Sequence, residues 1–179
     1  MSPKRLFHFS ESDAITEFRP RAAPAGHGLS EPVVWGITEQ MRANYLLPRA
    51  CPRVTFYVTA ATTAAHRTRL FCQEGARHVV AVEARWLPTI KAAAIVEYEL
   101  PPAHFVELDA GAGYYIARAP ITPLRKKTIT DLPAAIRDCG AELRVVANLW
   151  PLWDDVVNST VQFSMIRMRN AAPRIDHEA

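Results

Sequence analysis

A histidine and two aromatic residues near the start of the chain have the types and spacing of a ligand-binding cleft. His8 lies in the apolar segment 6–10, Trp35 lies in a second apolar segment, 33–38, and the short helix that follows carries Tyr45. Each apolar segment is typical of a buried strand. A histidine and an aromatic residue that neighbouring strands bring together can line a binding cleft. These residues predict a cleft without naming its ligand or a reaction.

The pattern of apolar residues predicts the elements that hold these side chains in place. Short strands and helices alternate along the chain, with connections rich in proline and glycine. Strands are expected at 6–10, 33–37, 53–59, 78–83, 95–100, 105–108, 114–119 and 142–148. Helices are expected at 38–47, 63–74, 86–94 and 131–139. The sum is an α+β fold with a mixed, mostly antiparallel sheet flanked by short helices.

Alternation along the first strand sets which side chains share a face. Leu6, His8 and Ser10 fall on one face, and Phe7 and Phe9 fall on the other. The segment 33–37 is apolar almost throughout, so we expect both of its faces to be covered.

The end of the chain supports two interpretations. Apolar residues from Trp153 to Met168 recur at helical spacing, which favours a long amphipathic C-terminal helix with Pro151 in its first turn. The β-branched residues between positions 156 and 161 favour a strand instead. We favour the long helix and leave helix or strand open for 159–169. We expect one α+β domain over 1–172 and a frayed tail over 173–179.

Composition limits the class of protein. The chain has 179 residues, of which 49% are hydrophobic, so one domain can bury a core without disulfides. Its three cysteines, Cys51, Cys72 and Cys139, are odd in number and show no CxxC spacing, which favours a reducing compartment. The start contains no signal-like apolar region, and no apolar run is long enough for a membrane span. We therefore predict a soluble, cytoplasmic protein with no membrane partner.

Charge gives a weaker indication of the partner. The net charge is +3, and between Arg42 and Arg85 the sequence has seven arginines against two acids, Glu74 and Glu83. This excess is compatible with a phosphate-bearing ligand, but nucleic-acid binders show a denser basic stripe, so we do not expect nucleic acid. The run 125–127 (Arg-Lys-Lys) is interpreted as a solvated turn. The oligomeric state is not predicted.

Five phrases of the sequence resemble those of a bacterial protein family of unknown function. The resemblance extends over nearly the whole chain and implies a full-length, stand-alone member, but no activity. Ala50 occupies a position where an aspartate is expected in that family. The phrases are LFHFS at 6–10, PRACPR at 48–53, GYYIA at 113–117, NLWPLW at 148–153 and FSMIRMRN at 163–170.

The first third of the chain also resembles the opening of the ADP-ribosyltransferase fold. In the histidine-tyrosine-glutamate class of that fold, a strand ends in a histidine, the next strand carries an aromatic residue, and the following helix carries a second aromatic residue. Here these positions correspond to His8, Trp35 and Tyr45, with ANY at 43–45 close to the helix phrase. The resemblance implies that His8 hydrogen-bonds the ribose of NAD and that the two aromatic rings enclose nicotinamide. Trp35 departs from the usual tyrosine, which keeps a stacking face but loses the phenol hydroxyl.

The same resemblance implies a catalytic glutamate on a late strand. Glu142 matches that position, where a carboxylate would stabilise an oxocarbenium-like transition state. Glu97 and Glu99, which share one face of the strand 95–100, are the alternative acids. Arg53 or Arg49 would contact the phosphates of NAD.

Structural roles explain the same residues without any ligand. His8 between two phenylalanines is typical of a structural histidine that bonds the backbone, and Trp35 in an apolar strand is typical of a core residue. Glu142 has the position of an ordinary exposed charge, and Cys51 that of a buried structural thiol. The histidines show no HxH or HExxH spacing, so no metal site is predicted.

Two hypotheses from different classes follow. The first is an ADP-ribosyltransferase-like domain that binds NAD or a related nucleotide between its N-terminal strands. It uses His8 and Glu142 in catalysis and Trp35, Tyr45 and Arg53 in binding. The second is a non-enzymatic ligand-binding or protein-interaction domain, with any protein-binding surface around the two tryptophans at positions 150 and 153.

Overall fold

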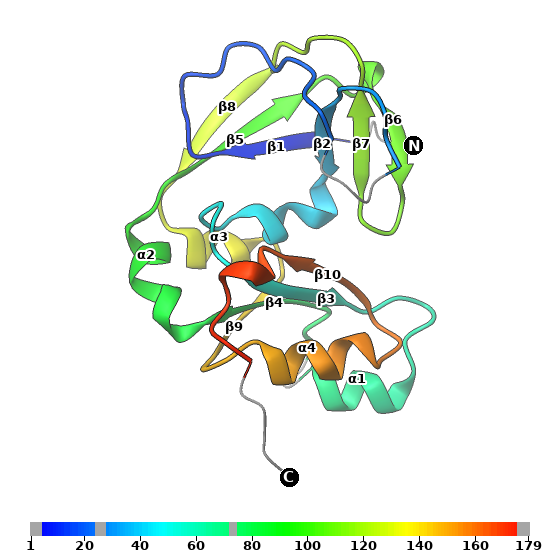
Figure 1. Cartoon of the computed structure of the whole chain (residues 1–179), viewed down its shortest axis with the longest axis vertical. Coiled ribbons are helices and arrows are strands. Elements are labelled where there is room, and N and C mark those ends of the chain that lie inside the picture. The colour runs from blue at the N-terminus through cyan, green and yellow to red at the C-terminus, as the bar shows by residue number, and fades with distance from the viewer. Residues whose placement is uncertain (1–4, 24–27, 72–74, 175–179) are drawn as a thin grey trace.

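Two β-sheets form the framework of the protein. The computed structural model describes residues 5–23, 28–71 and 75–174. A six-stranded sheet forms the upper half of the molecule in Figure 1, and a four-stranded sheet forms the lower half. The chain crosses between the two sheets several times, because strands from both halves of the sequence contribute to each sheet.

The upper sheet is antiparallel at each of its strand pairs. Its order is β6-β7-β2-β1-β5-β8, so β1 lies between β2 and β5. The pairing of β1 with β5 runs over five residue pairs, whereas its pairing with β2 stops after Phe7 and Ile37. The strands are β1 (Leu6–Ser10), β2 (Val34–Thr38), β5 (Ile95–Leu100), β6 (Val106–Asp109), β7 (Tyr114–Ala117) and β8 (Arg125–Ile129).

The lower sheet is mixed. Its order is β10-β3-β4-β9, with β4 and β9 parallel and the other pairs antiparallel. The residues of β4 are almost all buried, as expected for a strand inside a sheet covered on both faces. The strands are β3 (Arg53–Tyr57), β4 (His78–Glu83), β9 (Glu142–Val146) and β10 (Gln162–Ile166).

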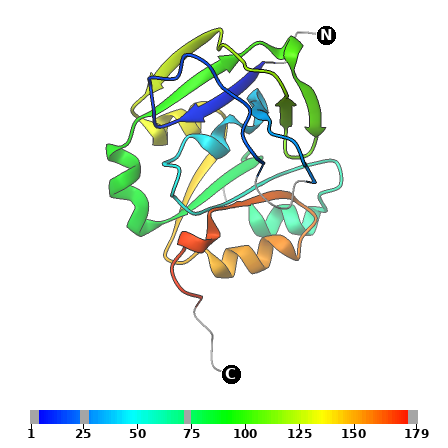
Figure 2. The same ribbon diagram turned by 45° about the horizontal axis from the view of Figure 1, so that its top comes forward.

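Short helices cover the sheets and separate them. Figures 1 and 2 show α1 and α4 together below the lower sheet, with α2 and α3 at the junction between the sheets. The side chains of Thr63 and Asp131 accept hydrogen bonds from the first turns of α1 and α3, as their types predict. The α-helices are α1 (Ala64–Leu70), α2 (Leu87–Ala92), α3 (Leu132–Asp138) and α4 (Trp150–Val157), and the 3-10 helices are η1 (Glu39–Tyr45), η2 (Ala84–Trp86), η3 (Pro102–His104) and η4 (Met168–Asn170).

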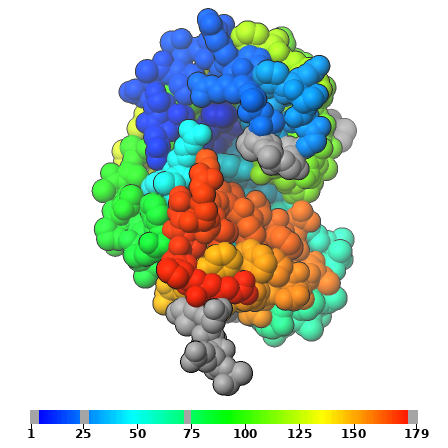
Figure 3. Space-filling view, in the orientation of Figure 1, coloured from blue at the N-terminus to red at the C-terminus, as the bar shows by residue number. Residues whose placement is uncertain are grey.

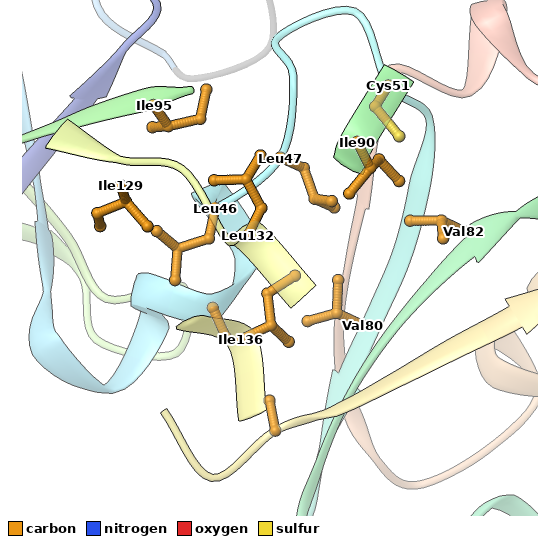
Figure 4. Packing of buried hydrophobic residues seen from close by; sticks show 12 residues of the cluster. Leu46, Leu47, Cys51, Val80, Val82, Ile90, Ile95, Ile129, Leu132 and Ile136 are labelled. Atoms are coloured by element: carbon orange, nitrogen blue, oxygen red, sulfur yellow. The ribbon is translucent and has the colours of Figure 1, made fainter. Parts of the chain in front are cut away.

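A buried apolar cluster joins the two sheets. Figure 4 shows leucines that follow η1 packed against valines of β4 and against side chains of α2 and α3. Ile95 of β5 and Ile129 of β8 bring the upper sheet into the same cluster. Because these side chains come from both sheets, the two sheets bury one shared core and form a single α+β unit.

Each sheet also has a face that points away from this junction. The outer face of the upper sheet packs Leu6, Val34 and Tyr98 against Phe18 and Ile121, which form a bridge outside the named strands. The outer face of the lower sheet packs against α1 and α4.

The predicted α+β architecture is confirmed, but two segments differ from the sequence-based expectation. The long C-terminal helix is wrong: α4 ends at Val157, and Gln162–Ile166 is strand β10, paired with β3. The helical spacing of apolar residues was misleading because the segment instead pairs with β3, over a ladder of five residue pairs. That partner strand lies far away in the sequence, so local spacing carries no sign of it. The solvated turn at 125–127 is also wrong, since Arg125–Ile129 forms the edge strand β8 against β5.

Of the tail expected at 173–179, only two residues fall in the described part of the chain. Pro173 accepts a hydrogen bond from Asn148 at 2.9 Å, and Arg174 forms an ion pair with Asp154. No helix in the described ranges is both long enough and apolar enough to cross a membrane.

Candidate functional site

Trp35 and Tyr45 both contact Tyr114, a residue that the sequence did not single out. The Trp35 and Tyr114 rings meet edge to face, with their centroids 5.5 Å apart. The Tyr45 hydroxyl donates a hydrogen bond to the Tyr114 hydroxyl at 3.0 Å, and Phe9 stacks on the Tyr45 ring at 6.2 Å. The predicted aromatic pair thus belongs to a larger cluster on the inner face of the upper sheet.

A pocket lies beside this cluster, where the two sheets meet. The empty space in and in front of it is about 240 Å³, a figure that includes open solvent, so the enclosed part is small. Four aromatic rings line it, from η1, β3, β7 and β10, together with amide and hydroxyl groups. The lining residues are Met41, Asn44, Tyr45, Thr55, Tyr57, Gly111, Ala112, Tyr114, Phe163 and Ser164.

The turn between β6 and β7 closes one side of the pocket and is fixed from two directions. The Tyr57 hydroxyl donates a hydrogen bond to the carbonyl oxygen of Gly111. Gly113 has φ +67°, and a Cβ at this position would lie 2.5 Å from Thr38 Oγ1 and 2.8 Å from Met41 Cγ. Only glycine therefore allows β7 to leave the turn this close to η1, and this approach brings Tyr114 to Tyr45.

The amide of Asn44 is held in one orientation at the back of the pocket. His78 Nε2 lies 2.8 Å from Asn44 Oδ1. Burial lowers the pKa of His78 to about 4, so its imidazole is neutral at pH 7 and donates from Nε2 to the amide oxygen. Neither residue was predicted, because nothing in the sequence links positions 44 and 78 before the two sheets are placed.

Tyr45 stays protonated as well. Burial raises its pKa well above the ordinary value, and the neighbouring Tyr114 raises it further, while the charge of Arg53 opposes the shift. The Tyr45 phenol therefore acts as a neutral hydrogen-bonding group.

His8 points to the opposite face of the upper sheet. Its register partner on β5 is Tyr98, and its ring contacts Phe18 of the outer cluster at 4.6 Å. His8 Nδ1 lies 2.9 Å from the carbonyl oxygen of Trp35, just beyond the point where the β1–β2 ladder stops. Burial lowers the pKa of His8, and a neutral ring can donate this bond. This geometry matches the structural role considered for His8, and it separates His8 from the side chains of Trp35 and Tyr45.

Glu142 is also remote from the pocket. It lies on β9, at the edge of the lower sheet, with its carboxylate bound by Arg144 through contacts of 2.7 and 2.9 Å. Arg144 also donates to the carbonyl of Leu70. The side chain of Glu142 is only 7% exposed, so the carboxylate is buried and already neutralised by a bidentate partner.

The alternative acids lie on the inner face of the upper sheet. Glu97 is the register partner of Phe9 and accepts hydrogen bonds from Arg42 at 2.6 and 2.8 Å. Glu99 is bound by Arg5, which lowers the pKa of that carboxyl group, and Arg125 adds to the effect. Of the acids singled out from the sequence, Glu97 therefore has the strand register closest to the aromatic cluster.

Arg53 opens β3 and is buried, whereas Arg49 is exposed. Arg53 Nη1 donates to the carbonyl oxygens of Pro48 and Cys51, each at 3.2 Å. Burial lowers the pKa of the Arg53 guanidinium, and the charge of Arg167 acts in the same direction. Arg49 donates its backbone N–H to Glu11, at 3.0 Å, on the exposed surface.

Two other features singled out from the sequence have structural roles. Burial raises the pKa of Cys51 to about 11, so its thiol is not a nucleophile at neutral pH. Trp150 and Trp153 meet edge to face, and the Arg174 guanidinium lies over both rings. Within the described ranges, no three His, Cys, Asp or Glu side chains gather as a metal site would require.

Comparison with known proteins identifies the family. A model of DUF6886, a family of unknown function, matches residues 7–171, and the chain belongs to this family. No curated protein and no solved structure matches the chain. The resemblance of the first third to the ADP-ribosyltransferase fold is supported by none of these comparisons.

Proposed function

We propose that this protein binds a small, planar ligand of the nucleotide class in the pocket between its sheets. The observation that carries the proposal is the convergence of Tyr45, Tyr57, Tyr114 and Phe163 around one open pocket, from four separate elements. Aromatic rings offer apolar faces for stacking, and their hydroxyls and the neighbouring amide can orient a heterocycle.

Polar groups held in fixed orientations favour the interpretation that the pocket binds a specific ligand, and not that its rings only pack against one another. Asn44 is oriented by His78, and Thr55 Oγ1 donates to the carbonyl of Ser164 at 3.1 Å. Groups held in place before binding lose little freedom when the ligand arrives. Nicotinamide, alone or as part of NAD, has a planar ring and an amide group that such a wall can orient.

ADP-ribosyl transfer is the enzymatic form of this proposal. It needs a carboxylate near the ribose of NAD, and Glu142, which is paired with Arg144 on β9, does not line the pocket. Glu97 does not line the pocket either, but its strand register is closer to the aromatic cluster, and it would have to leave Arg42 to take this role. Release of nicotinamide from NAD distinguishes the enzymatic form from binding alone.

Thermal unfolding with a pocket-filling variant tests the proposal. A ligand at about 100 times its dissociation constant adds about 2.7 kcal/mol, which is an upward Tm shift of a few degrees for a domain of this size. We expect such a shift with millimolar nicotinamide, NAD or ADP-ribose. Ala112→Phe places a ring in the pocket and should abolish the shift, because Ala112 lines the pocket.

Ala110→Phe is the matched control. Ala110 belongs to the same turn but is exposed and does not line the pocket, so its variant should keep the full shift. The proposal fails if none of the three compounds raises the Tm of the parent protein. It also fails if the ligands shift the Tm of the Ala112→Phe and Ala110→Phe variants by the same amount.

A further inference from the structure

The buried guanidinium of Arg53 lacks a counter-charge. The residue is 4% exposed, and within the described part of the chain it forms no ion pair. Its Nη1 atom is saturated by the carbonyl oxygens of Pro48 and Cys51. No described residue accepts a hydrogen bond from Nη2 or from the fully buried Nε.

The unpaired groups form the edge of the guanidinium that recognises anions. Nε and Nη2 point in parallel from one side of the arginine plane, and this fork matches two oxygens of a phosphate or carboxylate. A buried charge without a partner is strongly unfavourable, so its presence indicates an anion that completes the site.

A second arginine lies beside Arg53. Ile166 is the register partner of Arg53, and the next residue, Arg167, is close enough for its charge to lower the pKa of Arg53. Its carbonyl oxygen accepts a hydrogen bond from the Asn170 N–H, but its side chain has no hydrogen bond or ion pair to any described residue. It is also the one non-glycine residue in the described ranges with a positive φ, 55°. Backbone strain of this kind tends to occur where a side chain must be presented to a ligand.

The two arginines lie next to the aromatic pocket. Alternation along β3 places Arg53 on the same face as Thr55 and Tyr57, which both line the pocket. The phenol groups of Tyr45 and Tyr114 are near enough to act on the charge of Arg53. Figure 3 shows the chain that follows β10, in orange and red, against the surface of η1 and the residues after it, in cyan. Asn170 closes this contact by donating to the carbonyl of Ala50 at 2.6 Å.

We propose that the Nε–Nη2 edge of Arg53, assisted by Arg167, binds a phosphate group. This inference rests on the proposed function for the identity of the whole ligand, whereas phosphate binding itself needs only the two arginines. The phosphate belongs to the same molecule that enters the aromatic pocket, which makes the preferred ligand a phosphorylated nucleotide and not a free base.

Titration with inorganic phosphate, followed by calorimetry and by Tm, tests the subsite. Chloride at equal ionic strength controls for general screening. Hydrogen bonds to charged groups are strong enough that Arg53→Met should weaken phosphate binding about 10- to 100-fold. Arg53→Lys keeps the charge without the fork and should recover only part of the affinity.

Arg167→Gly keeps the test informative if Arg53 variants unfold. Glycine accepts φ 55° without strain, so this variant should fold at least as well as the parent and still bind phosphate more weakly. Arg137→Ala removes an exposed arginine of α3 as the matched control and should leave binding unchanged. The inference is overturned if phosphate does not bind the parent, or if Arg167→Gly and Arg137→Ala bind it equally.

The two proposals can fail separately. A Tm shift with nicotinamide but no binding of phosphate would leave the aromatic pocket in place and remove the arginine subsite. Binding of phosphate with no response to nicotinamide would do the opposite. Tighter binding of ADP-ribose than of either phosphate or nicotinamide is the result expected if both hold.

Discussion

The two faces of the upper sheet differ in how fully the chain satisfies the hydrogen bonds of their polar groups. On the outer face, His8 bonds the carbonyl of Trp35, and the Tyr98 hydroxyl donates to Ser12 and accepts from Ile15. On the inner face, phenols bond one another around an open pocket, and Arg53 keeps an unpaired edge nearby. Polar groups saturated within the chain maintain the fold, and groups left unsaturated beside a pocket are available to a ligand.

This comparison predicts that changes on the outer face alter stability alone. Changes on the inner face should alter ligand binding as well. Three experiments separate the two effects, and they are given from the largest expected change in stability to the smallest.

Gly113→Ala should have the largest effect, because it disrupts the wall of the inner pocket. Its Cβ would clash with Thr38 and Met41 in a left-handed backbone conformation, so we expect a loss of roughly 2–5 kcal/mol and of all ligand response. Gly140→Ala has a similar positive φ but no atom within 4 Å, so it carries backbone strain alone, about 1–2 kcal/mol. Urea unfolding compares the two variants. Equal losses would show that the close approach of β7 to η1 is unimportant.

Acidification should affect the pocket through His78, which lies on β4 of the lower sheet and bonds Asn44. Its pKa is about 4 in the folded protein and about 6.5 in an unfolded chain, so the unfolded state binds the proton first as the pH falls. The stability is fully present above pH ~6.5 and is lost between pH ~6.5 and ~4. We expect a loss of roughly 2 kcal/mol after allowing for partial exposure.

His78→Gln tests the assignment of this titration. Glutamine can donate to Asn44 without binding a proton, so unfolding free energies measured from pH 7 to pH 4 should fall more steeply in the parent than in the variant. His8→Gln should remove only the contribution of the outer face and leave the ligand response at neutral pH intact. Parallel curves for the parent and His78→Gln would contradict the role of His78.

A pair of tyrosine substitutions gives the finest test of the comparison. Tyr98→Phe leaves the Ser12 carbonyl and the Ile15 amide without their partner, and should cost about 1–2 kcal/mol of stability without changing ligand binding. Tyr45→Phe removes one bond to Tyr114 and should cost about 1 kcal/mol, with a clear loss of ligand affinity. Chemical unfolding measures the stability of both variants, and the ligand-induced Tm shift measures their ligand affinity. The distinction between the faces fails if Tyr98→Phe lowers affinity as much as Tyr45→Phe.

Local patterns predicted most of the elements that build the sheets. The runs at 78–83 and 95–100 are buried strands because their apolar and β-branched residues leave little alternative. Strand β8 was missed because three of its five residues are basic and solvent-exposed, a composition that resembles a loop. For 159–169 the strand was the alternative left open and the helix was favoured, because the pairing of β10 with β3 depends on a partner far away in the sequence.

The candidate site was predictable only in part. Trp35 and Tyr45 lie in one aromatic cluster, although Trp35 does not line the pocket, whereas the face occupied by His8 depends on strand register. A shift of one residue between β1 and β2 would move every side chain to the other face, and the sequence does not state that Phe7 pairs with Ile37. The lack of hydrogen-bond partners at Nε and Nη2 of Arg53 could not be predicted, since it depends on which acceptor atoms the folded chain places beside the guanidinium.

The pairing of β10 with β3 has a consequence for the order in which the chain folds. Thr55 bonds Ser164 across 109 positions in the sequence, and such distant contacts form late. During synthesis the strands of the upper sheet are complete once Ile129 has emerged, whereas the lower sheet still lacks β9 and β10. Phe163 and Ser164, which line the pocket, arrive after the rest of its wall. The pocket of a nascent chain is therefore completed only at the last step of assembly, so the proposed ligand would select finished molecules.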